Sequence, residues 1–599
     1  MEQIRYPSAH RSLLLVGLCL LGAAGAAHPA PSELLLIQGH DLRYCLETAQ
    51  QLNLRVIARL PSSILVEGGE AAAPTFKQRG LFASSVPVSN GSYLYQVRAE
   101  RYIDRRTLGT WGRVLVRDGN CAIIARDVQL TPSQRMIDRD TRLVPLDLSP
   151  KPYRNSPHLR LRLTQYDPDI AALVSQVDTT RIRQWVSHLQ GFRTRFLVSL
   201  NRFELVDTIR DRFLALGISD VVLDTFATEY LDSLGSDLQI NVVATIPGAD
   251  DTGIVYVVGG HYDSYSDVPY ALAPGADDNG TGLAAVMEVA RVLAAYPPRK
   301  TVRCIAFAAE EVGDLGSYHY AAQADSVDMN IGFMLCNDVM GNALNSGEIE
   351  VYRYPGIEAY GDLLGQCASA YTAVTPRYIE GYYSSDDWYF WQHGYPAGRG
   401  KEYPYSGRWH TTSDSLPYIS ATYCAELTKA GLAMTAIMAN YPGAVVGLAA
   451  RDVGDGHRAF VSWQAAAAAN VTGYRLYWGR TSDIYADSVT VSTVGDTIAG
   501  LLTDSLYYVA AAAIDDHDRL SPFLSEATVT PRSVPLAPSP VTATPVTGGV
   551  RVDWGRNTEL DLAGYALYRR TNGGSSDSLA ALTDSTFTDQ PLSGADRYY

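Results

Sequence analysis

The spacing of hydrophobic and polar positions changes twice along the chain. In residues 33–150, short apolar runs are separated by polar segments, which is the pattern of short strands. Apolar residues at helical spacing predict one helix there, and an Asp-Gly-Asn turn predicts a hairpin. We therefore expect a compact α+β unit, with strands Leu34–Ile37, Leu54–Arg59 and Ile64–Glu67, a helix bearing Leu42, Cys45, Leu46 and Ala49, and hairpin arms Val114–Val116 and Ala122–Ala125.

The second region, residues 160–442, alternates helical patterns with continuous apolar strands. Pro150, Pro152 and Pro157 mark the linker that precedes it. Apolar strands between helices predict an α/β domain whose mostly parallel mixed sheet is covered by helices on both faces. The predicted strands are Asn241–Ile246, Ile254–Val258, Val302–Ala308 and Ile331–Leu335, and the helices are Arg181–Leu189, Glu204–Leu216, Gly282–Leu293 and Ala421–Met438.

The third region, after Pro442, alternates in the manner of strands and repeats itself. Trp463, Gly473, Tyr474, Leu476, Tyr477, Tyr507 and Tyr508 recur 91 positions later, beginning at Trp554. One early Trp, a G-Y-x-L-Y strand and a later Tyr-rich strand resemble fibronectin type III β-sandwiches. We expect such all-β sandwich repeats at 445–532 and 536–599, the second one incomplete, with the aromatic residues in their cores.

Composition and charge narrow the function classes. The formal net charge is −15, and no basic run is present, so nucleic acid is not expected as a partner. No later stretch approaches the roughly 18 apolar residues of a membrane-spanning helix. The seven cysteines contain no Cys-x-x-Cys pair, so any metal site must use His and carboxylate ligands.

The first 26 residues have the pattern of a secretory signal peptide. Arg5 and Arg11 precede the apolar run Leu13–Leu21, and Ala24-Gly25-Ala26 fits a cleavage site. We therefore expect a secreted, extracellular protein, in which Cys45 and Cys121 could pair. The unit at 33–150 carries no chemical motif. It is either an accessory domain or a prodomain that is removed.

Chemistry-bearing residues follow the predicted strands of the α/β region. Gly259-Gly260 leads into His261 and Asp263, and a carboxylate beside a metal-bound His fixes its tautomer. The loop Pro274–Gly282 contains Asp277 and Asp278 among glycines before a helix. A single Asp there would be a helix cap, but a carboxylate can also bridge two cations.

Three further candidates complete the set. Glu310-Glu311 ends one strand, and because neighbouring side chains point apart, one can bind metal while the other acts as a base. Asp338 follows the next strand, and His410 lies in a loop. Each residue alone is more often a cap or an ordinary loop residue. Together, two His and three carboxylates on one edge of a sheet are donors that paired Zn²⁺ ions accept.

These motifs resemble the secreted co-catalytic di-zinc aminopeptidase family, which includes the bacterial leucyl aminopeptidases. The resemblance covers about residues 165–440 and implies the zinc exopeptidase fold with two Zn²⁺ ions per chain. It implies a bridging ligand, Asp277, with His261 and Asp338 on one ion and Glu311 and His410 on the other. It also implies Glu310 as general base and Tyr382, with Tyr383 as a rival, as the hydrogen-bond donor to the oxyanion. The Asp277–Asp278 bond is expected to be cis.

The sequence departs from the family pattern at two places. Asp387 stands where the family often has His, and Glu380 and Ser384 stand where some members have a disulfide. Neither change removes an expected ligand, but both bear on the wall of the substrate pocket.

The interpretation is a secreted zinc exopeptidase, most simply an aminopeptidase acting on peptides, with its fibronectin-type repeats contacting a surface or polymer. The alternatives are a glutaminyl cyclase with one zinc, a carboxypeptidase or dipeptidase of the same family, and a non-catalytic receptor or adhesin.

Overall fold

The computed structural model describes residues 34–598 in large part. The ranges that it leaves undescribed within that span are 40, 69–71, 90–91, 100–102, 119–120, 131–135, 139–140, 147–162, 164–165, 229–236, 251–252, 381–384, 467–469, 524, 534, 559–561, 572–574 and 591–596. The predicted signal peptide, the proline linker and Tyr382, Tyr383 and Ser384 therefore lie outside the described residues.

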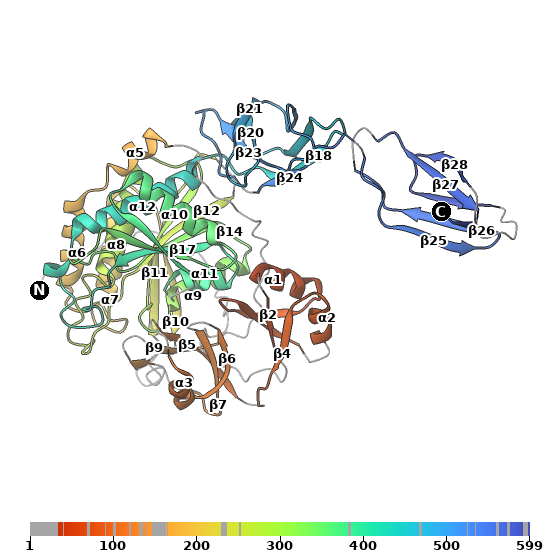
Figure 1. The fold of residues 1–599 in the computed structure, drawn as a ribbon. Helices are drawn as coiled ribbons and strands as arrows, with labels where there is room; N and C mark the ends of the chain where they lie inside the picture. Colours follow the sequence, from red (N-terminus) through yellow and green to blue (C-terminus); the bar gives the residue numbers. More distant parts are fainter. Residues whose placement is uncertain are drawn as a thin grey trace, which may run out of the picture.

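The N-terminal unit consists of two β-sheets with short helices (Figure 1). One sheet has the order β2-β3-β1-β4 and the other the order β6-β7-β5-β9-β8. The elements are β1 (Leu34–Gln38), α1 (Leu42–Gln51), β2 (Arg55–Arg59), β3 (Ser63–Glu67), α2 (Ala73–Gln78), β4 (Phe82–Val86), β5 (Tyr93–Ala99), α3 (Arg105–Trp111), β6 (Arg113–Asp118), β7 (Cys121–Arg126), β8 (Met136–Asp138) and β9 (Thr141–Pro145).

The predicted strands, helix and hairpin of this unit are confirmed, but the pattern missed several elements. Helices α2 and α3 are two turns or fewer, too short to display an apolar face, and β4 buries only one of its five residues. The suggested disulfide is not formed. Cys45 and Cys121 are both buried, and they belong to different hydrophobic clusters.

The α/β body is built on an eight-stranded mixed sheet with the order β10-β11-β13-β12-β14-β17-β15-β16. The central strands β13, β12, β14 and β17 run parallel to one another, and β15 is parallel to β16, whereas the pairs β10–β11, β11–β13 and β15–β17 are antiparallel. The strands are β10 (Asp220–Thr228), β11 (Asp237–Ile246), β12 (Ile254–His261), β13 (Thr301–Phe307), β14 (Asn330–Asn337), β15 (Glu348–Arg353), β16 (Thr375–Glu380) and β17 (Ala397–Tyr403).

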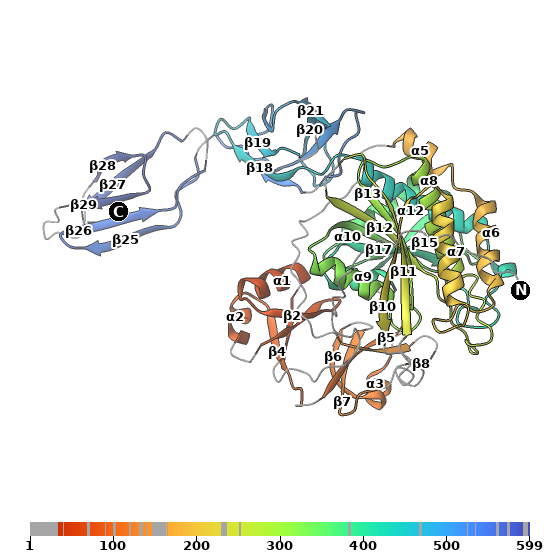
Figure 2. The same cartoon turned by 180° about the vertical axis from the view of Figure 1, so that it is seen from behind.

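Helices cover both faces of this sheet (Figures 1 and 2). One layer contains α6, α8, α10 and α12, which contact one another, and α9 and α11 pack together on the other side. Helices α8 and α12 are buried on nearly all sides, as expected for central helices that are apolar all round. The helices are α5 (Pro168–Val174), α6 (Thr179–Gly191), α7 (Arg202–Ala215), α8 (Gly280–Ala295), α9 (Leu315–Ser326), α10 (Glu358–Tyr371), α11 (Asp387–Gln392) and α12 (Ala421–Asn440).

The parallel arrangement brings the chemical motifs to one edge. Strand β12 lies between β13 and β14 and runs parallel to both, so the carboxyl ends of all three strands meet. His261 is the last residue of β12, Glu310 follows β13 by a short turn, and Asp338 follows β14 directly. This edge is where open α/β sheets place their ligands.

The C-terminal region forms two successive two-sheet β units that extend away from the body (Figure 1). In the first, Trp463 and Tyr474 pack in the core with ring centroids 5.5 Å apart, and the equivalent pair Trp554 and Tyr565 has the same separation. The tandem repeat is therefore visible in the packing. The strands are β18 (Val446–Asp452), β19 (Ala459–Gln464), β20 (Val471–Gly479), β21 (Asp487–Val491), β22 (Gly495–Ile498), β23 (Tyr507–Asp515), β24 (Ala527–Val529), β25 (Val541–Val546), β26 (Gly549–Trp554), β27 (Tyr565–Thr571), β28 (Ser576–Leu582), β29 (Thr586–Asp589) and β30 (Arg597–Tyr598).

Polar contacts join the units to the body. The side-chain amide of Gln392, at the end of α11, accepts from the backbone N–H of Arg59 at 3.2 Å and donates to its carbonyl at 2.9 Å. Arg299 of the body reaches Asp516 of the first β unit at 3.3 Å. Among the described residues, no helix is both long and apolar enough to cross a membrane.

Candidate metal centre

Two glycines let the strand that carries His261 run through the tightest part of the sheet. A Cβ at Gly259 would lie 2.3 Å from the Phe307 ring, and one at Gly260 would lie 2.6 Å from the carbonyl oxygen of Asn337. No larger residue fits at either position without moving the neighbouring strands. The Gly-Gly-His sequence therefore places the imidazole at the carboxyl edge of the sheet, where it is 1% exposed.

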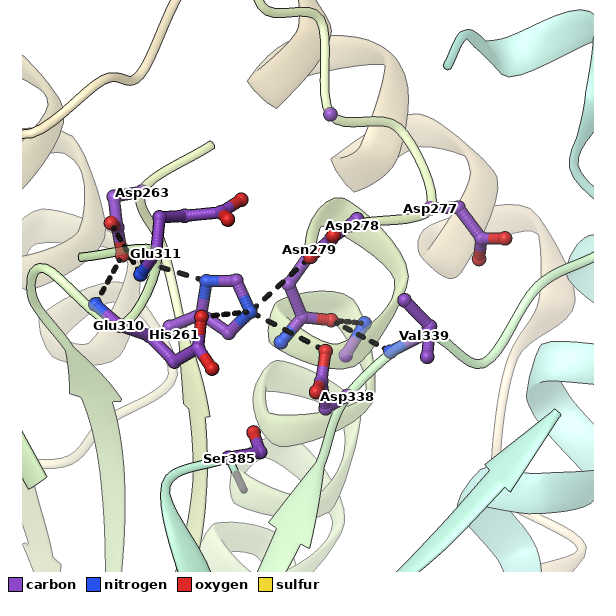
Figure 3. A network of polar contacts seen from close by, with 12 residues as sticks. His261, Asp263, Asp277, Asp278, Asn279, Glu310, Glu311, Asp338, Val339 and Ser385 are labelled. Atoms are coloured by element: carbon purple, nitrogen blue, oxygen red, sulfur yellow. Dashed lines mark hydrogen bonds and ion pairs between the residues drawn. The ribbon is translucent and has the colours of Figure 1, made fainter. Parts of the chain in front are cut away.

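Three side chains converge on His261 at one end of the site (Figure 3). Its Nε2 atom lies 3.3 Å from Oδ1 of Asp338, 3.4 Å from Oδ1 of Asp278 and 3.8 Å from Oε2 of Glu310. All four residues are buried. An imidazole facing carboxylate oxygens from separate loops is a group that can hold a cation.

A second group forms around His410. Its Nε2 atom lies 3.0 Å from Oδ2 of Asp278 and 3.0 Å from Oε2 of Glu311. The two oxygens of Asp278 therefore face the two histidines separately, Oδ1 toward His261 and Oδ2 toward His410. This is the geometry of a carboxylate that bridges two sites.

The expectation that Asp277 is the bridging residue is wrong by one position. The carboxylate of Asp277 points away from His261 (Figure 3), and its Oδ1 atom accepts hydrogen bonds from the Gly341 N–H at 2.9 Å and the Thr281 hydroxyl at 3.1 Å. Burial, with Glu402 beside it, raises the pKa of Asp277 well above the usual range for a carboxyl group. Asp277 thus holds the loop through hydrogen bonds outside the site, and Asp278 faces the two histidines.

The expected cis bond is displaced in the same way. The non-proline cis peptide joins Asp278 to Asn279, and the Asp277–Asp278 bond is not among the cis bonds. Asn279 is the N-cap of α8, with its side chain accepting from the Gly282 N–H at 2.9 Å.

Asp263 contacts both His261 and the Glu310-Glu311 turn, whereas the sequence indicated only the first contact. One oxygen lies 3.5 Å from Nδ1 of His261, as expected of a residue that orients a ligand imidazole. The same carboxylate accepts from the backbone N–H groups of Glu310, at 3.1 Å, and Glu311, at 3.2 Å. Asp263 therefore fixes the histidine and the Glu-Glu turn relative to each other.

The pKa values of the site residues reflect the many carboxylates around them. Burial alone would lower the pKa of His261, but Glu310 foremost, with Asp263, Asp278 and Asp338, raises it well above its usual value. Burial likewise opposes the charge on His410, whose pKa the Glu311 carboxylate raises. Burial disfavours the ionised form of Asp278, yet the two histidines hold its pKa below its usual range.

The donor set fits zinc. Two imidazoles and several carboxylates are the borderline and hard donors that Zn²⁺ accepts. Zinc bonds of about 2.1 Å in tetrahedral geometry separate neighbouring donor atoms by roughly 3.4 Å. The separations of 3.0–3.4 Å from the histidine Nε2 atoms to Asp278, Asp338 and Glu311 match that spacing. The carboxylates of this buried group also outnumber its cationic side chains, which a bound cation would balance.

Unusual backbone conformations hold the side chains in place. Ala309 precedes Glu310 with φ 56°, Val339 follows Asp338 with φ 47°, and His410 itself has φ 56°. Left-handed backbone is uncommon for residues other than glycine, and for a β-branched residue such as Val339 it is a true outlier. Strained residues of this kind gather at functional sites.

Other residues that hold the loops of the site could not be recognised from the sequence. Asp414 accepts from the N–H groups of Asp277, at 2.9 Å, and Asp278, at 3.0 Å. Arg195 is buried and donates to three carbonyl oxygens, of Tyr262, Pro274 and Gly275. It joins the His261 segment to the loop of Asp278. Isolated charged residues far from the motifs in sequence give no indication of such contacts.

The structure describes Asp387 and Glu380, two residues at which the sequence departs from the resembled family. Asp387 is fully buried as the first residue of α11, where it accepts a hydrogen bond from the Tyr354 hydroxyl at 2.7 Å. Glu380 ends β16 and pairs with Arg353. The roles expected for Tyr382 and Tyr383, and the disulfide position Ser384, fall outside the described residues.

Comparison with known proteins finds similarity in the central region. Residues 241–435 match the model of Peptidase family M28. A probable zinc metalloprotease of Pyricularia oryzae is 35% identical over 195 residues, 30% of this chain and 39% of that protein. Leucine aminopeptidase 1 of Penicillium rubens is 29% identical over 299 residues, 46% of this chain and 75% of that protein.

The chain spans less than half the length of the first curated relatives that it matches. Among solved structures, the Legionella pneumophila LapA aminopeptidase aligns with 69% of this chain and 99% of its own at 18% identity, with a TM-score of 0.42. A likeness that low supports no assignment by itself. The motifs of His261, Asp278, Glu310-Glu311, Asp338 and His410 all lie within residues 241–435, the range that matches the Peptidase family M28 model.

Proposed function

We propose that residues 160–442 form a zinc-dependent exopeptidase that binds two Zn²⁺ ions and removes N-terminal residues from peptides. The observation that carries the proposal is the position of Asp278, whose two oxygens face His261 and His410 separately. Asp338 would complete the first zinc site, and Glu311 the second.

Glu310 is the proposed general base. Its carboxylate lies 3.8 Å from Nε2 of His261, so it borders the first site, while its neighbour Glu311 faces His410. Bound zinc would polarise the scissile carbonyl and lower the pKa of a water molecule. Glu310 would take the proton from that water and pass it to the departing amine, and Tyr382 would donate to the oxyanion.

The similarity to an aminopeptidase supports recognition of a free amino terminus. Leucine aminopeptidase 1 of Penicillium rubens resembles this chain over 299 residues, 75% of that protein. A C-terminal carboxylate would instead need a cationic partner, and Arg399 is already engaged by Asp338 at 3.3 Å. Aminopeptidase action is therefore favoured over carboxypeptidase action.

A peptide panel tests the proposal. The zinc-loaded full chain is incubated with one peptide in three forms: free at both ends, N-acetylated, and C-amidated. We expect cleavage of the first peptide bond in the free and amidated forms and none in the acetylated form. Glu310→Gln serves as the control for contaminating activity. Cleavage that requires a free C-terminus would identify a carboxypeptidase, and cleavage limited to two-residue substrates a dipeptidase.

A glutaminyl cyclase is the second candidate, and zinc stoichiometry separates it from the first. The His410 group, with Asp278 and Glu311 each at 3.0 Å, supports a second zinc position. Conversion of N-terminal glutamine to pyroglutamate with one zinc per chain would favour the cyclase.

Export and attachment complete the proposed role. The signal-like residues 1–26 support a secreted protein, and the two C-terminal β units support contact with a surface or polymer through fibronectin type III-like domains. Mass analysis of the secreted protein's N-terminus would test the export and would also report whether residues 33–150 are removed.

A further inference from the structure

A buried arginine lies directly beside one of the proposed zinc ligands. Arg399 is on β17, which runs parallel to β14 and pairs Arg399 with Cys336, two residues before Asp338. The side chain is 1% exposed, and its Nη1 atom donates to Oδ2 of Asp338 at 3.3 Å. The other oxygen of Asp338, Oδ1, faces His261 at 3.3 Å. The two oxygens of this carboxylate therefore have different partners.

Neighbouring groups offset the cost of burying the Arg399 side chain. A guanidinium removed from water is costly unless charges and hydrogen bonds meet it. Burial opposes its charge, but Asp387 foremost holds the pKa of Arg399 well above its ordinary value. The ring of Tyr352 lies below the guanidinium, with the Arg399 carbon 4.7 Å from its centroid.

Asp387 is itself held in position. It is fully buried, and the Tyr354 hydroxyl donates to its Oδ2 atom at 2.7 Å. Burial raises the pKa of Asp387, and the nearby Arg399 counteracts that rise. Asp387 is thus a buried carboxylate whose charge acts on Arg399, and Arg399 itself contacts Asp338.

We propose that Arg399 is a positioning residue for Asp338. Arg399 holds Oδ2, so that Asp338 presents Oδ1 to the zinc site beside His261. The inference rests on the proposed zinc function and adds a residue that no motif identified. Partners behind a metal ligand orient it, and their loss lowers metal affinity by about 10–100-fold.

The test measures the affinity of each zinc position separately. Full-length wild type, Arg399→Met and Arg399→Lys are titrated with zinc against a chromophoric chelator. We expect Arg399→Met to weaken one zinc by about 10–100-fold and leave the other nearly unchanged, because the second position is assigned to His410 and Glu311 and does not use Asp338. Arg399→Lys keeps the charge and should restore part of the affinity. At saturating zinc, kcat should fall in Arg399→Met with little change in KM.

Lys401→Met is the matched control. Lys401 is on the same strand, is 1% exposed, and packs over the rings of Tyr405 and Trp409 at 4.3 and 4.6 Å. It should leave both zinc affinities near those of wild type. If Arg399→Met folds and keeps both affinities within about threefold, the positioning role is refuted while the proposed function stands. Equal loss of both ions in Arg399→Met and Lys401→Met would show only a structural role and would also overturn the inference. If wild type binds no zinc, both proposals fail.

Discussion

Replacement of Arg195 by methionine tests how the metal loop is held. Its Nε atom donates to the carbonyl oxygen of Tyr262 at 2.8 Å, Nη1 to that of Pro274 at 2.7 Å and Nη2 to that of Gly275 at 2.8 Å. The side chain is 1% exposed, and although burial lowers its pKa to about 10, it remains charged at neutral pH.

The expected loss follows from these three contacts. Each buried carbonyl left without a donor costs about 1–3 kcal/mol, and part of that loss is offset because a guanidinium no longer has to be desolvated. We therefore expect Arg195→Met to lower the free energy of unfolding of the zinc-free protein by about 3–5 kcal/mol. Zinc affinity should fall as well, since Arg195 joins the segment after His261 to the loop that carries Asp278.

Urea unfolding in excess chelator measures the first effect, and chelator competition measures the second. Arg183→Met, an exposed arginine on α6, is the control and should change stability by less than about 0.5 kcal/mol. A stability for Arg195→Met within about 1 kcal/mol of this control, with unaltered zinc affinity, would refute the role assigned to the arginine.

Three further predictions concern the catalytic pair, a buried acid and the N-terminal unit. Glu310→Gln should keep its zinc and lower the rate by about 10²–10⁴, whereas Glu311→Gln should lose one zinc and regain activity with added Zn²⁺. Metal analysis together with rate assays separates the two variants, and the reverse result would exchange the two roles. Glu402 has its pKa raised by burial to about 7, so the native state holds a proton that the unfolded state has lost between about pH 4.5 and 7. The unfolding free energy of the zinc-free protein should therefore fall as pH rises through that window, by up to about 3 kcal/mol from this group, and Glu402→Gln should flatten the slope; an unchanged slope would contradict this. Gln392→Ala leaves the N–H and carbonyl of Arg59 without their partner, so limited proteolysis should release the N-terminal unit faster than in wild type, and an unchanged rate would show that this contact does not hold the unit.

The sequence predicted the parts of the fold that depend on apolar patterning. Strands β11 to β14 and helices α6, α7, α8 and α12 carry continuous or amphipathic runs, and they lie where expected. Strand β17 escaped notice because its sequence, Ala-Gly-Arg-Gly-Lys-Glu-Tyr, reads as polar, although all but its last residue is buried. Its burial depends on partners far away in sequence, such as Asp338 for Arg399, and no local pattern contains that information.

The candidate site was predictable to within one residue at its centre. His261, Glu311 and Asp338 converge as the strand-end argument required, because parallel strands bring their carboxyl ends together, and His410 joins them from a loop. The choice between two adjacent aspartates was not fixed by this argument. It depends on the backbone turn before Asn279, which sends neighbouring side chains to opposite sides of the loop.

Zinc analysis of two neighbouring variants tests the central claim most directly. Wild type, Asp278→Asn and Asp277→Asn are loaded with Zn²⁺, passed over a desalting column and measured for metal content by mass spectrometry. The account predicts two zinc ions per chain in wild type and in Asp277→Asn, and fewer than two in Asp278→Asn, because Asp278, unlike Asp277, faces both His261 and His410. Full zinc content in Asp278→Asn with loss in Asp277→Asn, or fewer than two ions in wild type, would contradict it.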